Sequence, residues 1–506
     1  MRRKHIMLDN QNIKLGVKPY KFVILTLDSH AAGPAERVGK KLSSDFPGLE
    51  MSIHAAAEWG ENPASLNSAK VAIKEADFIV STLLFLEEHI QAILPELKDR
   101  RASLDGFVGC VASKEIVSLT KMGSLDMGVP SKGFLSLLKK LRGSGKSNKS
   151  SGGEKQMAML RKLPKILKFI PGKAQDLRAY FLSMQYWLGG SDENIESMVR
   201  FLLNRYGSIS SQSNIEANPP VEYPETGIYH PDVAERIFTD AQKIPRFNNN
   251  GTVGILLMRS YVLSGDTAHY DAVIRQLTKD GMNVIPVFAA GLDGRPAIEK
   301  YFKPDGQLLV DTVVSLMGFS LVGGPAYNDS KAAESTLIDL DVPYVGAHAL
   351  EFQTLDQWRE SEGGLGPVES TMLIALPELD GAIAPTVFGG RLGPGQEMVP
   401  CNERVKKLSN KLKKLVALRR VSVKERKVAI ILYGFPPNAG AIGSAAYLSV
   451  YESLFNTLNS LKGEGYDLIP PKSVDELRNS ILKGNSDKFG QEANVHIKIS
   501  ADDIVS

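Results

Sequence analysis

The sequence predicts an α/β protein made of several doubly wound, mostly parallel sheet domains, with a helical insertion and a final α/β unit that is unfinished where the chain ends. Three observations lead to this prediction. Short apolar runs of strand length alternate with segments of helical period, the turns between them are short, and the alternation starts again in the middle and near the end of the 506 residues. Such alternation is typical of parallel sheets with right-handed crossovers, and the length allows roughly three or four domains.

The first domain, residues 1–142, is predicted to be flavodoxin-like. Its apolar runs are bounded by turn residues and are too short to be helices. One helix is expected to reach about Asp45, and another to cover 87–100. The expected strands are 20–28, 49–54, 77–84 and 104–111.

Three segments of different character follow this domain. Residues 143–155 are rich in Gly, Ser and Lys and are predicted to form a flexible basic linker. Their Gly-Ser-Gly-Lys-Ser start resembles the tail of a phosphate-binding loop, but Lys140 stands where the full pattern needs Gly, so we expect no nucleotide site. Residues 156–210 are predicted to be a helical segment whose later helix is capped by Asp192, and residues 211–250 an irregular connection.

The central α/β domain, residues 251–400, has the pattern of a ligand-binding sheet. Its first apolar run, 253–258, is expected to be a buried strand, and 270–277 has helical period. Ligands of such sheets bind beyond the carboxyl ends of the strands. Arg259 and His269 fall at that edge.

A basic helix and linker, residues 401–427, leads into the start of a further α/β domain, residues 428–506. A sheet of two or so strands is too small to be stable alone, so this unit is expected to be incomplete. Its glycine-rich turn at 434–443 does not match GxGxxG, which argues against a nicotinamide cofactor. The expected strands are 427–433 and 466–469, and the expected helices are 444–461 and 474–482.

Charge and cysteine content restrict the class of protein. Residues 139–173 and 404–427 each hold eleven Lys or Arg against one Glu, so the remainder of this chain of net charge +3 is acidic. Neither basic segment interleaves aromatic residues as single-strand binders do, so no nucleic-acid partner is expected. Cys110 and Cys401 have no metal-site spacing and fit a reducing, cytoplasmic compartment. No signal peptide and no apolar run of about 18 residues is seen, which leaves peripheral membrane association open.

Candidate histidines lie in the central domain. His269 opens a helix beside Asp266, and two interpretations are open. In the first, Asp266 caps the helix and His269 is an ordinary residue of its first turn. In the second, His269 handles a metal or a proton, since a neutral imidazole binds metals and titrates near neutral pH. His348 and Glu351, three residues apart, are a further candidate pair, but this spacing is common.

Candidate carboxylates and arginines lie nearby in the sequence. Glu378 and Asp380 are expected between a helix and a strand, where they form either a paired-carboxylate site for a cation or proton, or a capped turn. Arg391 follows a Val-Phe-Gly-Gly run and can bind a ligand carboxylate bidentately, or can be a surface arginine without a ligand.

Long stretches of the chain resemble the large (H) subunit of magnesium chelatase, in its bacteriochlorophyll-type branch. That family also includes the large subunit of cobaltochelatase. The likeness begins near Phe22 and runs to the end of the chain. It is carried most clearly by residues 253–293, 310–326, 352–358, 375–391 and 435–450.

The resemblance implies a subunit that binds protoporphyrin IX and is the place where Mg²⁺ is inserted, while two ATPase-class partner subunits hydrolyse ATP. The downstream methyltransferase is a further implied partner. We expect Arg259 and Arg391 to bind the porphyrin propionates, and His269 and Glu378 to handle protons or metal; the metal ligands themselves are not identified.

The family's large subunits are more than twice this length, and their HGxxEF-type motif has no counterpart here, so this chain is expected to be a front portion that supplies one wall of the site. The alternatives are a non-catalytic porphyrin carrier or scaffold, a fragment of the cobaltochelatase large subunit, and an unrelated solute-binding α/β protein.

Overall fold

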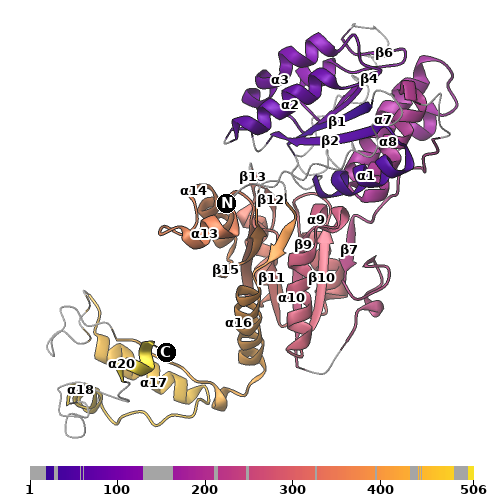
Figure 1. Ribbon diagram of the computed structural model, residues 1–506. Coiled ribbons are helices and arrows are strands. Elements are labelled where there is room, and N and C mark those ends of the chain that lie inside the picture. The colour runs from indigo at the N-terminus through magenta and orange to yellow at the C-terminus, as the bar shows by residue number, and fades with distance from the viewer. Residues whose placement is uncertain are drawn as a thin grey trace. The chain divides into compact units, whose positions relative to one another are not determined.

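The computed structural model divides into two compact units, one reaching to Leu412 and one beginning at Lys413 (Figure 1). The division falls within one long helix, α16 (Asn402–Arg420). The phosphate-loop-like stretch at 143–147 and nearly all of the glycine-rich turn at 434–443 lie outside the described residues. The structure describes residues 19–27, 32–56, 59–60, 62–128, 163–209, 215–246, 250–324, 327–393, 396–432, 443, 445, 447–483 and 500–505.

The first sheet has six strands in the order β2-β1-β3-β4-β5-β6. The first four strands run parallel in the order of flavodoxin-like sheets, and the last two are added antiparallel. All four strands predicted for this part of the chain are confirmed. The strands are β1 (Tyr20–Thr26), β2 (Leu49–Ala55), β3 (Phe78–Thr82), β4 (Gly106–Cys110), β5 (Lys121–Met122) and β6 (Leu125–Asp126). The helices between them are α1 (Ala32–Asp45), α2 (Pro63–Glu75), α3 (Glu87–Arg100) and α4 (Lys114–Ser118).

Both faces of this sheet are covered, because successive side chains of a strand point to opposite faces. Phe22 of β1 belongs to a core shared with α1 and with two later helices, α7 (Lys173–Gly189) and α8 (Asp192–Tyr206). Val23 belongs to a second core, shared with α2 and α3. The predicted helical segment therefore forms one layer of the first domain.

The prediction that Asp192 caps α8 is wrong. The N-cap is Ser191, whose hydroxyl accepts a hydrogen bond from the backbone N–H of Asn194. Asp192 lies in the first turn, and its carboxylate accepts hydrogen bonds from Arg37 instead. A serine before the first acidic residue competes well for the cap, because its short side chain reaches the same N–H group.

The second sheet has eight strands in the order β16-β15-β14-β11-β9-β10-β7-β8. The five central strands are parallel, and both edges are closed by antiparallel strands. The strands are β7 (Thr226–Tyr229), β8 (Ile237–Phe238), β9 (Thr252–Met258), β10 (Asn283–Ala289), β11 (Thr312–Ser315), β14 (Tyr344–Leu350), β15 (Ile383–Arg391) and β16 (Met398–Pro400). A short separate hairpin is formed by β12 (Gly323–Gly324) and β13 (Tyr327–Asn328).

The irregular connection predicted for 211–250 is wrong for part of its length. Strands β7 and β8 lie within it, and β7 pairs antiparallel with β10. The four residues of β7 show too little apolar alternation to be recognised as a strand. Their backbone becomes extended because β10 offers an open row of hydrogen-bonding groups, which is a tertiary effect.

The strand order of the sheet reverses at β9. The next strand in the sequence, β10, lies on one side of β9, and the strand after it, β11, lies on the other side. The topological switch point of the sheet therefore lies between β9 and β11. Leu256 and Val313 pack from these strands into a core that includes Phe302. The helices of this region are α9 (Arg259–Ser264), α10 (Ala268–Lys279), α11 (Arg295–Tyr301), α12 (Ser330–Leu340), α13 (Leu355–Glu360), α14 (Pro367–Glu369), the π-helical turn η6 (Ser370–Ala375) and α15 (Leu376–Asp380), with 3₁₀ turns at η4 (Ala241–Lys243) and η5 (Pro304–Gly306).

The regular structure described in the second unit is helical. Both predicted helices are present, as α17 (Val450–Gly463) and α18 (Val474–Lys483), followed by α20 (Ala501–Val505); η7 (Val423–Glu425) is a 3₁₀ turn. The two predicted strands are wrong over their described parts, since 427–432 and 466–469 have no regular structure. A strand forms only against a partner, and the described residues from Lys413 onward contain no strand for either segment to pair with. In the described part of the chain, none of the helices combines the length and apolarity needed to cross a bilayer.

Candidate functional site: two cavities at the carboxyl ends of the central strands

The larger of two cavities lies at the carboxyl end of β10 and has a volume of about 470 Å³. One wall is α7, which contributes Phe181, Met184 and Leu188. The opposite wall comprises 220–226 and 289–291, with Arg259 at the start of α9. We call this cavity the α7 cleft. Its volume is within the range of small-molecule sites, and its lining is mainly apolar with a few polar groups, as in such sites.

Arg259 is held against the wall of the α7 cleft. Its Nε donates to the carbonyl oxygen of Pro224 at 3.2 Å, and its Nη2 donates to that of Tyr223 at 3.3 Å. The wall is in turn fixed to α8, because the side chain of Asn194 donates to the carbonyl of Val221 at 3.1 Å and accepts from its N–H at 2.9 Å. The position of Arg259 at the sheet edge, expected from the sequence, is confirmed, and the structure places it in the wall of a cavity.

The second cavity, of about 280 Å³, lies at the switch point, and we call it the switch-point pocket. Its walls come from the ends of three neighbouring strands: Met258 at the end of β9, Met317 just after β11, and Ala349 near the end of β14. The start of α10 and the π-helical turn complete it. The described residues that line it include none of those that line the α7 cleft.

His269 lines the switch-point pocket and is fully buried. Its ring is surrounded by other rings: the centroid of Tyr270 is 3.9 Å away, that of Tyr261 is 5.1 Å away, and Phe388 stacks at 5.7 Å. The expected helix start at this histidine is confirmed. The N-cap of α10 is Thr267, however, so the interpretation in which Asp266 caps the helix is wrong.

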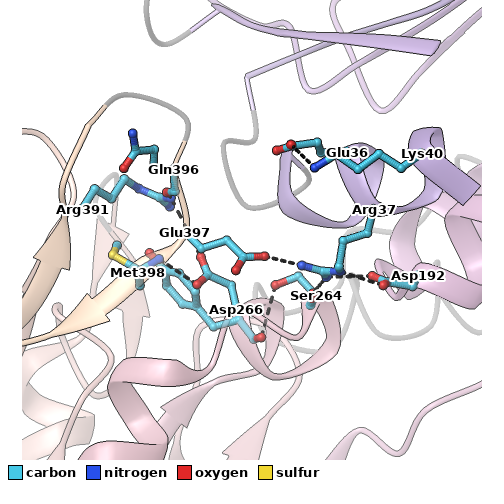
Figure 2. A network of polar contacts seen from close by, with 11 residues as sticks. Glu36, Arg37, Lys40, Asp192, Ser264, Asp266, Arg391, Gln396, Glu397 and Met398 are labelled. Carbon is cyan, nitrogen blue, oxygen red and sulfur yellow. Dashed lines mark hydrogen bonds and ion pairs between the residues drawn. The ribbon is translucent and has the colours of Figure 1, made fainter. Parts of the chain in front are cut away.

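Asp266 instead connects α10 to the far edge of the sheet (Figure 2). Its Oδ1 accepts the backbone N–H of Met398 at 2.7 Å, and its Oδ2 lies 3.9 Å from Nη1 of Arg391. Arg391 is only 5% exposed and also donates to the carbonyl of Gln396. Arg391 thus pairs with Asp266, three residues before His269, and shares β15 with Phe388, which stacks on His269. It is not among the residues that line either cavity.

Glu378 and Asp380 lie within α15, so the expectation that they occupy a connection between helix and strand is wrong. Residues two apart on a helix do not face each other. Glu378 is exposed, whereas Asp380 is buried and accepts from the Ser320 hydroxyl at 2.8 Å and the Leu321 N–H at 2.7 Å. Burial raises the pKa of Asp380. Glu378 lines neither cavity, and the four candidate residues do not share one site.

Two carboxylates beside the switch-point pocket were not assigned to it from the sequence. Glu351, just after β14, lines the pocket and accepts a hydrogen bond from the hydroxyl of Tyr261 at 2.6 Å. Glu369 is 1% exposed and accepts the backbone N–H groups of Phe352 and Gln353 at 3.1 and 3.4 Å. The position of Glu351 after a strand end was a usable signal, whereas Glu369 had none. His348, considered with Glu351, lies inside β14 and is buried, which lowers its pKa to about 4.

The described residues contain no group of three or more His, Cys, Asp or Glu side chains placed to hold a metal ion. Comparison with known proteins then places the chain. The family described as CobN/Magnesium Chelatase matches residues 184–504, and a domain of unknown function, DUF3479, matches residues 21–181. The chain belongs to the CobN/magnesium chelatase family. The α7 cleft and the switch-point pocket are thus features of a chain from this family.

The relatives are longer than this chain. It is 55% identical over 510 residues to the H subunit of magnesium chelatase from Cereibacter sphaeroides, covering 97% of this chain and 43% of that protein. It is 56% identical to the corresponding protein of Rhodobacter capsulatus, covering 96% and 42%. The chain therefore spans about two fifths of the length of these relatives. The fold is similar to part of the catalytic subunit of cobaltochelatase from Mycobacterium tuberculosis, with a TM-score of 0.55, 16% identity, and coverage of 92% of this chain and 33% of that one.

Proposed function

We propose that this chain is the porphyrin-binding part of an H-type magnesium chelatase subunit, and that its α7 cleft receives one rim of protoporphyrin IX. The observation that carries the proposal is the cleft itself: an open, mainly apolar cavity at the carboxyl end of β10 with an arginine in its wall, in a chain of this family. In the proposed reaction, Mg²⁺ is inserted into the macrocycle for bacteriochlorophyll synthesis in the cytoplasm. Two ATPase-class partner subunits hydrolyse ATP, and the product passes to a methyltransferase.

The chemistry of the cleft suits a flat, apolar dianion. Phe181, Met184 and Leu188 offer an apolar wall against which a macrocycle face can pack. The guanidinium of Arg259 donates to the carbonyl oxygens of Pro224 and Tyr223, and its positive charge at the cleft wall attracts a propionate carboxylate. Glu222 and Glu225, both exposed, also line the cleft and repel propionates, so we expect the propionate edge to approach Arg259 and avoid these two glutamates.

The other candidate residues have different places in this proposal. Arg391 lines neither cavity and contacts Asp266 and Gln396 within the protein, so the proposed propionate contact is Arg259, which lines the cleft. Proton or metal handling by His269 or Glu378 remains a prediction, and the two residues do not line a common cavity. Magnesium is chosen over cobalt because the relatives at 55 and 56% identity are magnesium-chelatase subunits.

Protoporphyrin IX titration tests the binding step. Trp187, on α7 beside the lining residue Leu188, is a built-in fluorescence reporter, and we expect saturable quenching that is reduced in a Trp187→Phe variant. Leu188 is 38% exposed, so the Leu188→Asp variant should still fold. The new carboxylate would lie against the macrocycle and would have to lose its water when the porphyrin binds, which disfavours binding. We expect affinity to fall about ten-fold or more, equivalent to about 1.4 kcal/mol.

The matched control is Leu379→Asp, at a leucine of α15 that is 66% exposed and lines neither cavity. It should bind as the unmodified chain does. Quenching that does not saturate, or equal affinity for the two Asp variants, would reject the α7 cleft as the porphyrin site. Saturable binding without ATP- and partner-dependent Mg²⁺ insertion in a reconstituted complex would identify a carrier instead.

A further inference from the structure

The switch-point pocket has the position at which sheets of this kind bind ligands. In open α/β sheets, ligands bind outside the carboxyl ends of the strands, where the strand order reverses. Here that place is between β9 and β11, and the pocket is lined by the residues that end or follow these two strands, Met258 and Leu316. The α7 cleft lies at β10, one strand away from this point.

The size and lining of the pocket specify the body of its ligand. An apolar cavity of about 150 Å³ holds one benzene ring, so about 280 Å³ holds a ligand of roughly two rings. Met258, Met317 and Met372 contribute flexible, polarisable walls that adapt to an aromatic body. At the mouth, Leu292 and Phe352 are 41 and 57% exposed, which leaves an apolar entrance open to solvent.

The charge of the pocket specifies the other end of the ligand. Glu351 is exposed at the pocket and already accepts the Tyr261 hydroxyl, which leaves further acceptor positions on its two oxygens. Among the described lining residues none is Lys or Arg, so the carboxylate has no cationic partner in the lining. A carboxylate beside aromatic rings, in a pocket whose described lining includes no Lys or Arg, attracts an organic cation.

Two further features show that the Glu351 end of the pocket is held in place. Glu369, which is buried, accepts the backbone N–H groups of Phe352 and Gln353 and so anchors the segment that begins at Glu351. Glu369 directly precedes the π-helical turn, which carries the lining residue Met372. Such turns are rare and occur frequently at functional sites.

We propose that the switch-point pocket is a binding site, distinct from the α7 cleft, for a small organic cation with a one- or two-ring aromatic body. The rings lie among the methionine and aromatic side chains, and the ammonium group lies at Glu351. Glu369 is a positioning residue, because it acts through the backbone that carries Glu351. The site does not depend on porphyrin binding in the α7 cleft.

Three indole probes of one size and different charge test this proposal on the full chain by isothermal titration calorimetry. Tryptamine, a cation, should bind about ten-fold more tightly than the neutral alcohol tryptophol, and indole-3-acetate should bind most weakly. Glu351→Gln should reduce tryptamine affinity about ten-fold and leave tryptophol nearly unchanged, because it removes charge and keeps shape. Glu360→Gln, an exposed glutamate of α13 that does not line the pocket, is the matched control.

Several results would overturn the proposal: no tryptamine binding, equal affinity for all three probes, or a Glu351→Gln variant that binds tryptamine as the unmodified chain does. If Glu351→Gln unfolds, Met372→Trp replaces it, since the larger side chain fills the pocket and should abolish binding of all three probes. Protoporphyrin quenching is measured in the same variants. It should be unchanged by Glu351→Gln, so failure of either site is seen separately.

Discussion

Replacing Arg37 by alanine should loosen the contact between the first domain and the central sheet. Arg37, on α1, donates to both carboxylate oxygens of Asp192 at 2.8 Å and to the carbonyl of Ser264 at 2.6 Å, and it pairs with Glu397 (Figure 2). One guanidinium thus connects α1, α8, the end of α9 and the segment before β16. Because these segments are far apart in the sequence, the loss should be felt across the first compact unit.

The expected magnitude follows from exposure. Exposed ion pairs contribute about 0.2–1 kcal/mol each, and the hydrogen bond to the Ser264 carbonyl about 1 kcal/mol. The Arg37 side chain is 38% exposed, so solvent screening keeps both pairs in that weak range. We expect Arg37→Ala to lower the free energy of unfolding by about 2 kcal/mol.

Urea unfolding followed by tryptophan fluorescence measures this change, with Lys40→Ala as the matched control. Lys40 is on the same helix and pairs only with exposed Glu36 in the contacts drawn, so its loss should cost at most about 0.5 kcal/mol (Figure 2). A double-mutant cycle with Glu397→Gln should give a coupling of about 0.5 kcal/mol or more. If Arg37→Ala lowers the free energy of unfolding no more than Lys40→Ala does, the contacts of Arg37 do not stabilise the packing of the first domain against the central sheet.

Two other changes test the core of the central sheet. Burial lowers the pKa of His348 to about 4, below its unfolded value of about 6.5. The unfolded state therefore binds the proton more readily, and the free energy of unfolding should fall as the pH drops from about 6.5 to about 4. His348→Leu should flatten this part of the curve of stability against pH, and an unchanged curve would show that the histidine is not held neutral. A side chain at Gly254 of β9 would place its Cβ 2.7 Å from the Phe302 ring. Gly254→Val should therefore lower the free energy of unfolding by about 1–3 kcal/mol and lower the melting temperature. At Gly463 a Cβ would meet nothing within 4 Å, so Gly463→Ala should leave the melting temperature unchanged or raised. Equal melting temperatures for these two glycine variants would contradict the close packing at β9.

The candidate functional site was predictable only in part. Arg259 and Glu351 directly follow apolar strands, and the rule that ligands lie at the carboxyl ends of parallel strands places both at cavities. Glu378 was misplaced because a helix continues through it by way of a π-helical turn, which local periodicity does not reveal. A local cap was one of the two interpretations open for Asp266, but its Oδ1 accepts the backbone N–H of Met398, 132 residues further on.

The sequence by itself determined the α/β class, most strands and helices of the first compact unit, and the family. These depend on local apolar period, on turn residues and on long matching stretches, all of which are read in order along the chain. Only the tertiary structure decided the strand order, the edge strand β7, the joining of α7 and α8 to the first sheet, and which side chains share a cavity. The reason is physical: a strand edge, a buried carboxylate or an arginine finds its partner by proximity after folding, and residues such as Arg37 and Glu397, 360 positions apart, carry no local sign of that contact.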